Sequence, residues 1–406
     1  MTQALVQNLH IYPIKSSAGI ELSNSWVEEL GLAMDRRFVL ASPDGEFITA
    51  RTQPSLCLIQ ANITATGLIV TAPNMPTLVI NYSELHDSYV EVRVWEDIIK
   101  AQQCRDNINQ WFSLYLQQPC QLLFFGAASQ RFVKNKNSQV GFADGYPLLL
   151  IAQASLDHLN SQYKAHSPSI AMAQFRPNIV VNNCDAFAED TWQHIRIGEV
   201  EFELTKPCSR CIFTTVDPLT SHQHPQQEPL TSLKKFRQLA NGDVLFGQNL
   251  VALTQGQIKR GDRVEILTRQ TAPTFNMPSN SSNKALDNKS NLAAKNKSTS
   301  NSELSIKKSK PSITFSSFNK TIIGNNRETL LEQGENAGLM LPFSCRGGMC
   351  GSCKVKLEQG QVEQLCQDGL SDEEQQQGYI LSCSCTPLTN VVISHPERKR
   401  RNISKD

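Results

Sequence analysis

The feature that most constrains this chain is a run of nine residues, 345-CRGGMCGSC-353, which carries three cysteines and three glycines. The spacing is C-x4-C-x2-C, and two further cysteines follow at 383 and 385. Three thiolates on one tight loop with one distant partner are the ligand pattern of a 2Fe-2S cluster. The glycines allow the unusual backbone angles of a loop wrapped around such a cluster. The predicted metal ligands are Cys345, Cys350 and Cys353, with either Cys383 or Cys385 as the fourth, because spacing alone does not decide between them.

Zinc is the alternative metal for this cysteine set, since four thiolates also suit a structural zinc ion. Zinc sites usually present two separated C-x2-C pairs, whereas this chain has three cysteines on one loop, separated by four and then by two residues. The pattern therefore favours iron and sulfide over zinc. Cys366 and the unused member of the Cys383 and Cys385 pair are expected to be packing thiols, with an alternative role as cluster ligand left open.

The charge balance excludes some classes of partner. Among 406 residues, 39 Lys and Arg face 38 Asp and Glu, so the formal net charge is +1 and gives no global attraction to nucleic acid or an anionic membrane. The longest apolar run, at 146–152, is far shorter than the roughly 20 residues that span a bilayer. The N-terminus lacks the pattern of a secretory signal. We therefore expect a soluble, cytoplasmic protein without membrane insertion, in which clustered cysteines serve metal or redox chemistry.

A change of composition divides the chain. Residues 269–310 are rich in Asn, Ser and Lys and have no apolar periodicity, which is typical of a flexible linker spanning roughly 35 Å. Before it, short β-branched stretches alternate with Gly, Pro, Asn and Asp, while helical periodicity is confined to 106–116, 153–165 and 230–240. The body is therefore predicted to be mainly β and barrel-like, with a few helices.

The body contains a second cysteine motif, 206-KPCSRCIFTTVDP-218, with Cys208 and Cys211 at C-x2-C spacing. This motif is weak by itself. A zinc half-site needs a second pair, and a thioredoxin-type dithiol should open a helix. The residues after Cys211 are instead expected to continue as a β-branched strand.

The C-terminal segment resembles the plant-type ferredoxins. Arg346 and Gly348 match that family's C-R-x-G-x-C-x-x-C loop, and 380-ILSCSCTP-387 matches its L-x-C-x-x-x-P ending. The resemblance implies an α+β β-grasp fold, with strands at 313–319 and 390–394 and a helix at 327–337. It also selects Cys383 as the fourth ligand, because Pro387 follows it by four residues.

The body resembles the MOSC-domain proteins over nearly all of residues 1 to 268. The matching motifs are 12-YPIKS-16, 35-DRR-37, 49-TAR-51, 175-FRPNIVV-181, KPCSRCIFTTVDP and 246-FGQN-249. The resemblance points to the mitochondrial amidoxime-reducing components and to the bacterial YcbX-type proteins, which have a C-terminal ferredoxin domain. It implies an N-terminal β-barrel domain, a MOSC β-barrel domain, a linker and a ferredoxin domain, at 1–120, 121–268, 269–311 and 312–406.

The MOSC resemblance implies that Cys211 binds the molybdenum of a molybdopterin cofactor and is the catalytic residue. A thiolate is a soft ligand that completes the coordination of such a metal. The cofactor's phosphate and pterin need cationic and hydrogen-bonding partners. The matching motifs supply Lys15, Ser16, Arg36, Arg51, Arg176, Asn178, Ser209 and Arg210. Second-rank candidates are Arg37, Asp144, Pro147, Thr214 and Asn249, whereas Cys208 is expected to be a packing thiol.

The two resemblances together imply an oxidoreductase that reduces small N-hydroxylated compounds. Electrons would pass from an external flavoprotein NAD(P)H reductase through the 2Fe-2S cluster to molybdenum, because the chain has no nucleotide-binding G-x-G-x-x-G and no flavin domain. One alternative is a non-redox MOSC binding or sulfur-carrier module, including one linked to pyridoxal phosphate chemistry, with a fused electron-transfer ferredoxin. Another is an electron-transfer adaptor whose body only docks partners.

Overall fold

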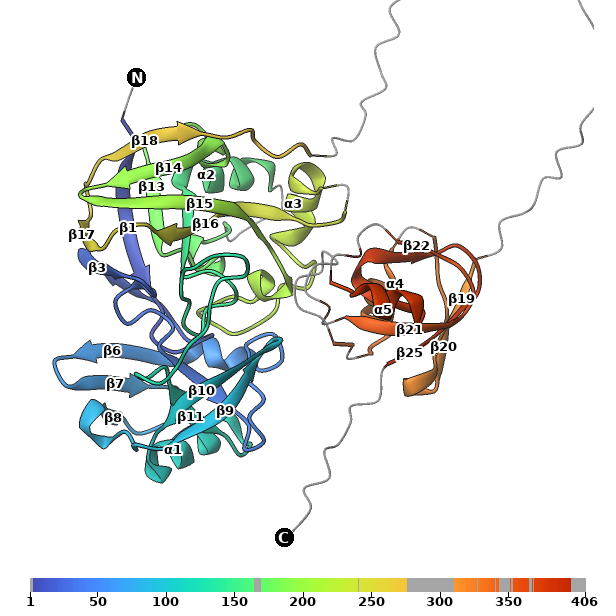
Figure 1. Ribbon diagram of the computed structural model, residues 1–406, viewed down its shortest axis with the longest axis horizontal. Coiled ribbons are helices and arrows are strands. Elements are labelled where there is room, and N and C mark those ends of the chain that lie inside the picture. Colours follow the sequence, from blue (N-terminus) through green and yellow to red (C-terminus); the bar gives the residue numbers. More distant parts are fainter. Residues whose placement is uncertain are drawn as a thin grey trace, which may run out of the picture. The chain divides into compact units, whose positions relative to one another are not determined.

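The computed structural model describes residues 3–163, 169–239, 241–275, 310–326, 328–339, 341–342, 351, 353–364, 367 and 369–395 (Figure 1). Two compact units divide the chain, one built mainly on residues 1–276 and the other mainly on 277–343 and 353–406. We refer to them as the body and the C-terminal unit.

The body is organised around an eight-stranded sheet. Its strands, in spatial order, are β18 (Val264–Arg269), β14 (Trp192–Ile197), β15 (Val200–Ser209), β16 (Leu245–Ala252), β12 (Leu148–Ala152), β13 (Ile179–Asn182), β1 (Leu5–Ile11) and β2 (Ile20–Leu22). All neighbours are antiparallel except the β12 and β13 pair. The continuous apolar run of β12 is buried on both faces: Leu148 and Leu150 enter one core, and Leu149 and Ile151 enter another.

Three smaller sheets complete the body. The first contains β5 (Phe38–Ala41), β11 (Gln121–Phe124), β10 (Asp97–Gln103) and β9 (Tyr89–Val94). The second contains β6 (Gln60–Thr64), β7 (Gly67–Thr71) and β8 (Leu78–Asn81), and the third contains β17 (Gly256–Lys259), β3 (Asn24–Glu28) and β4 (Gly31–Leu32).

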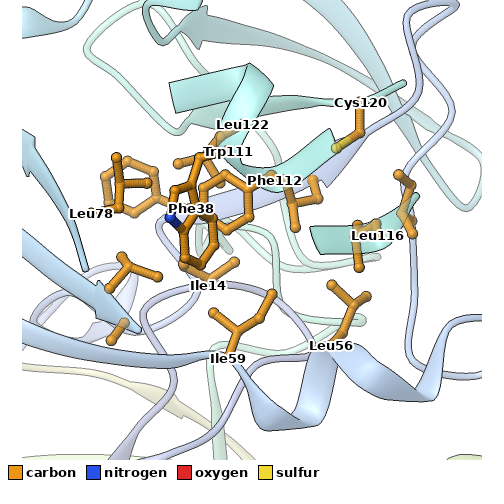
Figure 2. Packing of buried hydrophobic residues seen from close by; sticks show 14 of the residues in the cluster. Ile14, Phe38, Leu56, Ile59, Leu78, Trp111, Phe112, Leu116, Cys120 and Leu122 are labelled. Atoms are coloured by element: carbon orange, nitrogen blue, oxygen red, sulfur yellow. The ribbon is translucent and has the colours of Figure 1, made fainter. Parts of the chain in front are cut away.

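In the described part of the body, three α-helices pack against the sheets (Figure 1). The amphipathic helix α1 (Asp106–Leu116) contacts β8 and β11, and its residues match the predicted range. Figure 2 shows Trp111 and Phe112 of α1 within the same apolar cluster as Ile14 and Phe38. Helices α2 (Gln153–Gln162) and α3 (Leu230–Arg237) contact each other and the eight-stranded sheet.

The C-terminal unit is a small α+β fold. Its main sheet has the order β20 (Lys320–Ile323), β19 (Ser312–Phe315), β25 (Val391–Ser394), β21 (Lys354–Gln359) and β23 (Tyr379–Leu381), and β22 (Val362–Gln364) pairs with β24 (Cys385–Pro387). The first and last strands, β19 and β25, are parallel neighbours. The helices are α4 (Leu330–Asn336) and α5 (Asp372–Gln376), each with a Thr or Ser capping box. Helix α4 begins later than predicted because Thr329 caps it.

The predicted fold class is confirmed: the body is mainly β with few helices, and the C-terminal unit is a β-grasp. Strand β18 extends to Arg269, and Gln270 still donates to the backbone oxygen of Thr191. Among the described residues, no helix has the length and apolar character needed to cross a lipid bilayer.

Candidate functional site

Cys211 lies where strand β15 gives way to a single 3-10 turn, η5 (Ile212–Thr215). The expectation that a strand continues through these residues is wrong. The reason is local: the hydroxyl of Thr214 donates to the backbone oxygen of Cys211 at 2.9 Å, and that of Thr215 donates to Ile212 at 2.7 Å. Such side-chain bonds give the backbone an alternative to a sheet ladder. The turn fixes the Cys211 backbone, and the half-buried side chain lies with its sulfur beside the guanidinium of Arg51.

The nearest cation to this sulfur is Arg51. Its Nε lies 3.3 Å from Cys211 Sγ, its Nη2 lies 2.9 Å from an oxygen of Asp144, and its Nη1 lies 3.2 Å from Thr49 Oγ1. Burial lowers the pKa of Arg51, but the Cys211 sulfur and the Asp144 carboxylate outweigh burial and raise it above its usual value. Arg51 is therefore a fixed positive charge beside the candidate ligand.

Lys15 joins Arg51 on the other side of Asp144. Its Nζ lies 2.5 Å from Asp144 Oδ1 and 2.7 Å from the backbone oxygen of Phe142. Burial lowers the pKa of Lys15 to about 8, although Asp144 opposes this shift. The two cations hold the pKa of Asp144 well below its usual value, although desolvation by the neighbouring side chains acts in the opposite direction. Asp144 keeps 55% of its side-chain area exposed, so the bridged carboxylate faces the open side of the site.

A second group of cations surrounds the ring of Tyr12. Arg36 and Arg176 place their guanidinium carbons 4.2 and 4.0 Å from its centre. Arg36 pairs with Asp35 at 2.7 Å, and Arg176 donates to the backbone oxygen of Ser17 at 2.5 Å. The Nη2 of Arg176 is buried without a hydrogen-bond partner. Both arginines have left-handed backbones, at φ 45° and 56°, a costly state that clusters at ligand sites.

Arg210, directly before Cys211 in the chain, is another buried arginine of this cluster. Its Nε and Nη1 donate to the backbone oxygens of Phe246 and Phe175 at 2.8 and 3.0 Å, while its Nη2 is buried without a partner. The side chain is thus held rigidly by carbonyl groups that neutralise none of its charge.

The remaining predicted residues support this cluster through protein contacts. The amide oxygen of Asn178 accepts from Arg36 and from the backbone of Leu149. The hydroxyl of Ser16 accepts from the Ala50 backbone, and that of Ser209 donates to Asp243. Cys208 packs in an apolar core, where burial raises the pKa of its thiol.

The electrostatics and the unused donors fit an anionic ligand. Lys15 and Arg51 share the carboxylate of Asp144, and Arg36 is paired with Asp35, whereas Arg176 and Arg210 have no bonded carboxylate in the part of the chain that the structure describes. Five positive charges against two negative ones leave a net charge of +3 on this group. Buried uncompensated charge is costly. Two buried guanidinium nitrogens that lack partners are the donors a phosphate would take.

Sequence reasoning missed several supporting residues of this cluster. Tyr12 and Asp35 stand inside the quoted motifs, and their position there was the available signal. Arg131 had no signal: it lies far from every motif, yet its Nη1 and Nη2 donate to the backbone oxygens of Gly141 and Asp144 at 3.0 and 2.7 Å. It thereby fixes the loop that carries Asp144. Arg37 points elsewhere, since it pairs with Glu28.

In the C-terminal unit, two predicted ligands come together. Cys353 precedes β21, Cys383 lies in the short turn η7 (Ser382–Ser384), and their sulfurs are 3.0 Å apart. Ser382 fixes this approach by donating to the backbone oxygen of Cys353. Cys385 is fully buried at the start of β24, and burial raises the pKa of its thiol to about 12. Cys345, Cys350 and Cys366 lie outside the described residues.

Family models match three parts of the chain. A MOSC N-terminal beta barrel domain matches residues 3–119, a MOSC domain matches 137–265, and a 2Fe-2S iron-sulfur cluster binding domain matches 314–388.

Individual relatives agree with these matches. Mitochondrial amidoxime reducing component 2 of Rattus norvegicus is 33% identical over 285 residues, which are 64% of this chain and 82% of the relative. Mitochondrial amidoxime-reducing component 1 of Homo sapiens is 33% identical over 282 residues, with the same coverage. Component 1 of Danio rerio is 32% identical over 246 residues, 57% of this chain and 74% of the relative. The chain therefore belongs to the MOSC-domain family of the amidoxime-reducing components and carries a 2Fe-2S ferredoxin-type domain at its C-terminal end.

Proposed function

We propose that this protein is a molybdenum-cofactor oxidoreductase that reduces N-hydroxylated compounds with electrons received through its own 2Fe-2S domain. The observation that carries the proposal is the Cys211 sulfur 3.3 Å from the Arg51 guanidinium, in a body that also holds two buried guanidinium nitrogens without partners, on Arg176 and Arg210. The protein's relatives are named amidoxime-reducing components, which supports an amidoxime-type substrate. The net reaction consumes two electrons and two protons, breaks the N–O bond, and releases water and the reduced nitrogen compound.

Different residues of the body would bind different parts of a molybdopterin cofactor. Arg176 and Arg210 offer their free Nη2 donors to its phosphate, and Cys211 offers its sulfur to the metal. Once bound, the molybdenum cofactor supplies two-electron oxygen-atom transfer, and the 2Fe-2S cluster supplies single electrons to it. Arg36 and Asn178 hold the loop around Arg176 through the backbone oxygen of that residue and a shared hydrogen bond.

Lys15 and Asp144 of the same site have a role in proton transfer. The Nζ of Lys15 lies 2.5 Å from Asp144 Oδ1, and a pKa of about 8 makes transfer of a proton from Lys15 feasible close to neutral pH. Asp144 is the exposed member of this pair, so it connects the buried ammonium group to water. We infer that Lys15 supplies protons to the N–O oxygen, and that Asp144, whose pKa is held well below its usual value, stays ionised and orients the ammonium group.

The C-terminal unit is the electron entry point in this proposal. Cys353 and Cys383 supply two cluster ligands, Cys345 and Cys350 supply the others, and a flavoprotein NAD(P)H reductase supplies the electrons. The cytoplasmic location stays a prediction.

Elemental analysis tests the proposal directly. Chain purified from a host that makes the cofactor should contain about one molybdenum and about two iron atoms. It should reduce an aromatic amidoxime with a chemically reduced viologen dye as donor. Iron without molybdenum would instead support an electron-transfer adaptor, and molybdenum without N–O bond cleavage would support a non-redox binding module.

A further inference from the structure

The tip of the hairpin between β9 and β10 carries an unusual residue. Val94 pairs with Asp97, so Trp95 and Glu96 form a two-residue loop. Trp95 has a left-handed backbone, with φ 59°. Loops of this length normally place Asn, Asp or Gly in that conformation, since a bulky side chain there is strained. The turn itself therefore does not explain why a tryptophan stands at this position. The contacts of its ring do.

The half-buried ring of Trp95 supports Arg51. The guanidinium carbon of Arg51 lies 4.6 Å from the centre of the indole ring. Behind it, Phe47 meets Trp95 edge to face at 4.7 Å, and Lys15 Nζ lies 5.4 Å from the Phe47 ring. Two aromatic rings thus form a wall beneath both cations that bind Asp144.

This wall completes the restraint of Arg51. Its three nitrogens reach Cys211, Thr49 and Asp144, and these bonds define directions within the guanidinium plane. Because the indole ring of Trp95 covers one face of the guanidinium group, it limits how far the guanidinium plane can tilt. Without the ring, Arg51 would be free to follow the exposed carboxylate of Asp144 and leave the sulfur.

We propose that Trp95 is a positioning residue, which keeps the Nε–H of Arg51 directed at the Cys211 sulfur. Such hydrogen bonds withdraw electron density from a ligating thiolate and tune the potential of its metal. A hairpin within the region that matches the N-terminal beta barrel model thereby acts on a cysteine of the MOSC domain. The effect on the metal rests on the proposed function, whereas the restraint on Arg51 does not.

A purely structural role for Trp95 is the competing explanation, because its ring also packs against an apolar cluster. Trp95→Leu keeps an apolar side chain but removes the flat face, and Trp95→Met does the same if the leucine variant does not fold. Trp95→Tyr keeps a flat face. The matched control is Trp26→Leu, which removes an exposed tryptophan from strand β3.

The first measurement uses the full chain without cofactor. Hydrogen exchange of the Arg51 Nε–H, followed by nitrogen-15 NMR, should be about tenfold faster in Trp95→Leu and unchanged in Trp95→Tyr and Trp26→Leu. In the molybdenum-loaded chain, the Mo(V) electron paramagnetic resonance signal of Trp95→Leu should appear at a lower potential, and kcat should fall about tenfold with little change in KM.

Three outcomes would overturn this role for Trp95. The first is unchanged Nε–H exchange in Trp95→Leu, with or without a lower melting temperature. The second is equally fast exchange in Trp95→Tyr, because the flat face would then not be the cause. The third is an unchanged Mo(V) potential despite fast exchange, which would separate Arg51 from the metal. A wild-type chain that reduces no N-hydroxylated compound contradicts the proposed function alone, since the exchange measurement needs no turnover.

Discussion

The two candidate centres of this chain are built in opposite ways. In the body, Arg51 meets Cys211 across 160 residues and Arg36 meets Asn178 across 142. In the C-terminal unit, Cys353 meets Cys383 across 30 residues, inside an apolar core. The body centre brings buried cations together, whereas the thiols of the C-terminal unit become negatively charged when they are deprotonated. Buried cations suit a large anionic ligand, because they balance its charge. An iron-sulfur cluster is held by thiolates and needs no such group of cations.

Replacement of Cys211 should have the largest effect. Cys211→Ser is expected to lower N-hydroxylamine reduction by more than about 1000-fold, because the soft metal ligand is lost while the protein fold is retained. Turnover with the viologen donor and the iron-sulfur absorbance measure the two centres separately, and the absorbance should not change. Cys208→Ala is the matched control, since that thiol only packs, and it should keep most of the activity. Full activity in Cys211→Ser would remove Cys211 from its role.

The fourth cluster ligand can be tested in the same way on the other centre. Cys383→Ser should lose the cluster, seen as bleached absorbance and loss of iron, because its sulfur faces Cys353 at 3.0 Å. Reduction driven by the flavoprotein donor should then disappear, while reduction driven by the viologen should continue. Cys385→Ala should retain the iron, since Cys385 is a buried packing thiol. If the two variants exchange these outcomes, Cys385 is the ligand.

Cleavage between residues 280 and 300 tests whether the two centres work together. Covalent linkage raises the effective concentration of one partner for the other. At low protein concentration, cleavage should therefore lower donor-driven turnover by about 100-fold, and added C-terminal fragment should restore it. Uncut chain with the same inserted protease site is the control. Unchanged turnover after complete cleavage would show that the fused domain is not on the electron route.

The same contrast explains what the sequence could predict. The C-x4-C-x2-C loop and the alternating apolar pattern are local, so they predicted the 2Fe-2S domain, the mainly β body and the bounds of α1. The η5 turn was missed because two threonine hydroxyls decide it, against the β propensity of the segment. Trp95 and Arg131 were missed because their roles depend on contacts with distant strands and loops, which no local spacing encodes.

Burial of Lys15 provides the smallest and most specific test of the body centre. Its pKa falls from 10.5 to about 8 on folding, chiefly through burial. Between these values the unfolded chain retains a proton that the folded chain has released, so the free energy of unfolding should rise with pH across this window. The expected rise for cofactor-free protein is about 3 kcal/mol, at roughly 1.4 kcal/mol per pH unit.

Urea unfolding of the body at several pH values, compared with Lys15→Met, would isolate this contribution. The variant should lose the rise and should be the more stable protein near pH 7, where the wild type must keep a buried ammonium charged. A bound anion would favour that charge, so the rise should also shrink in the cofactor-loaded chain. Parallel curves for wild type and Lys15→Met would mean that Asp144 alone compensates the lysine. The body centre would then need no anion to balance its charge at this position.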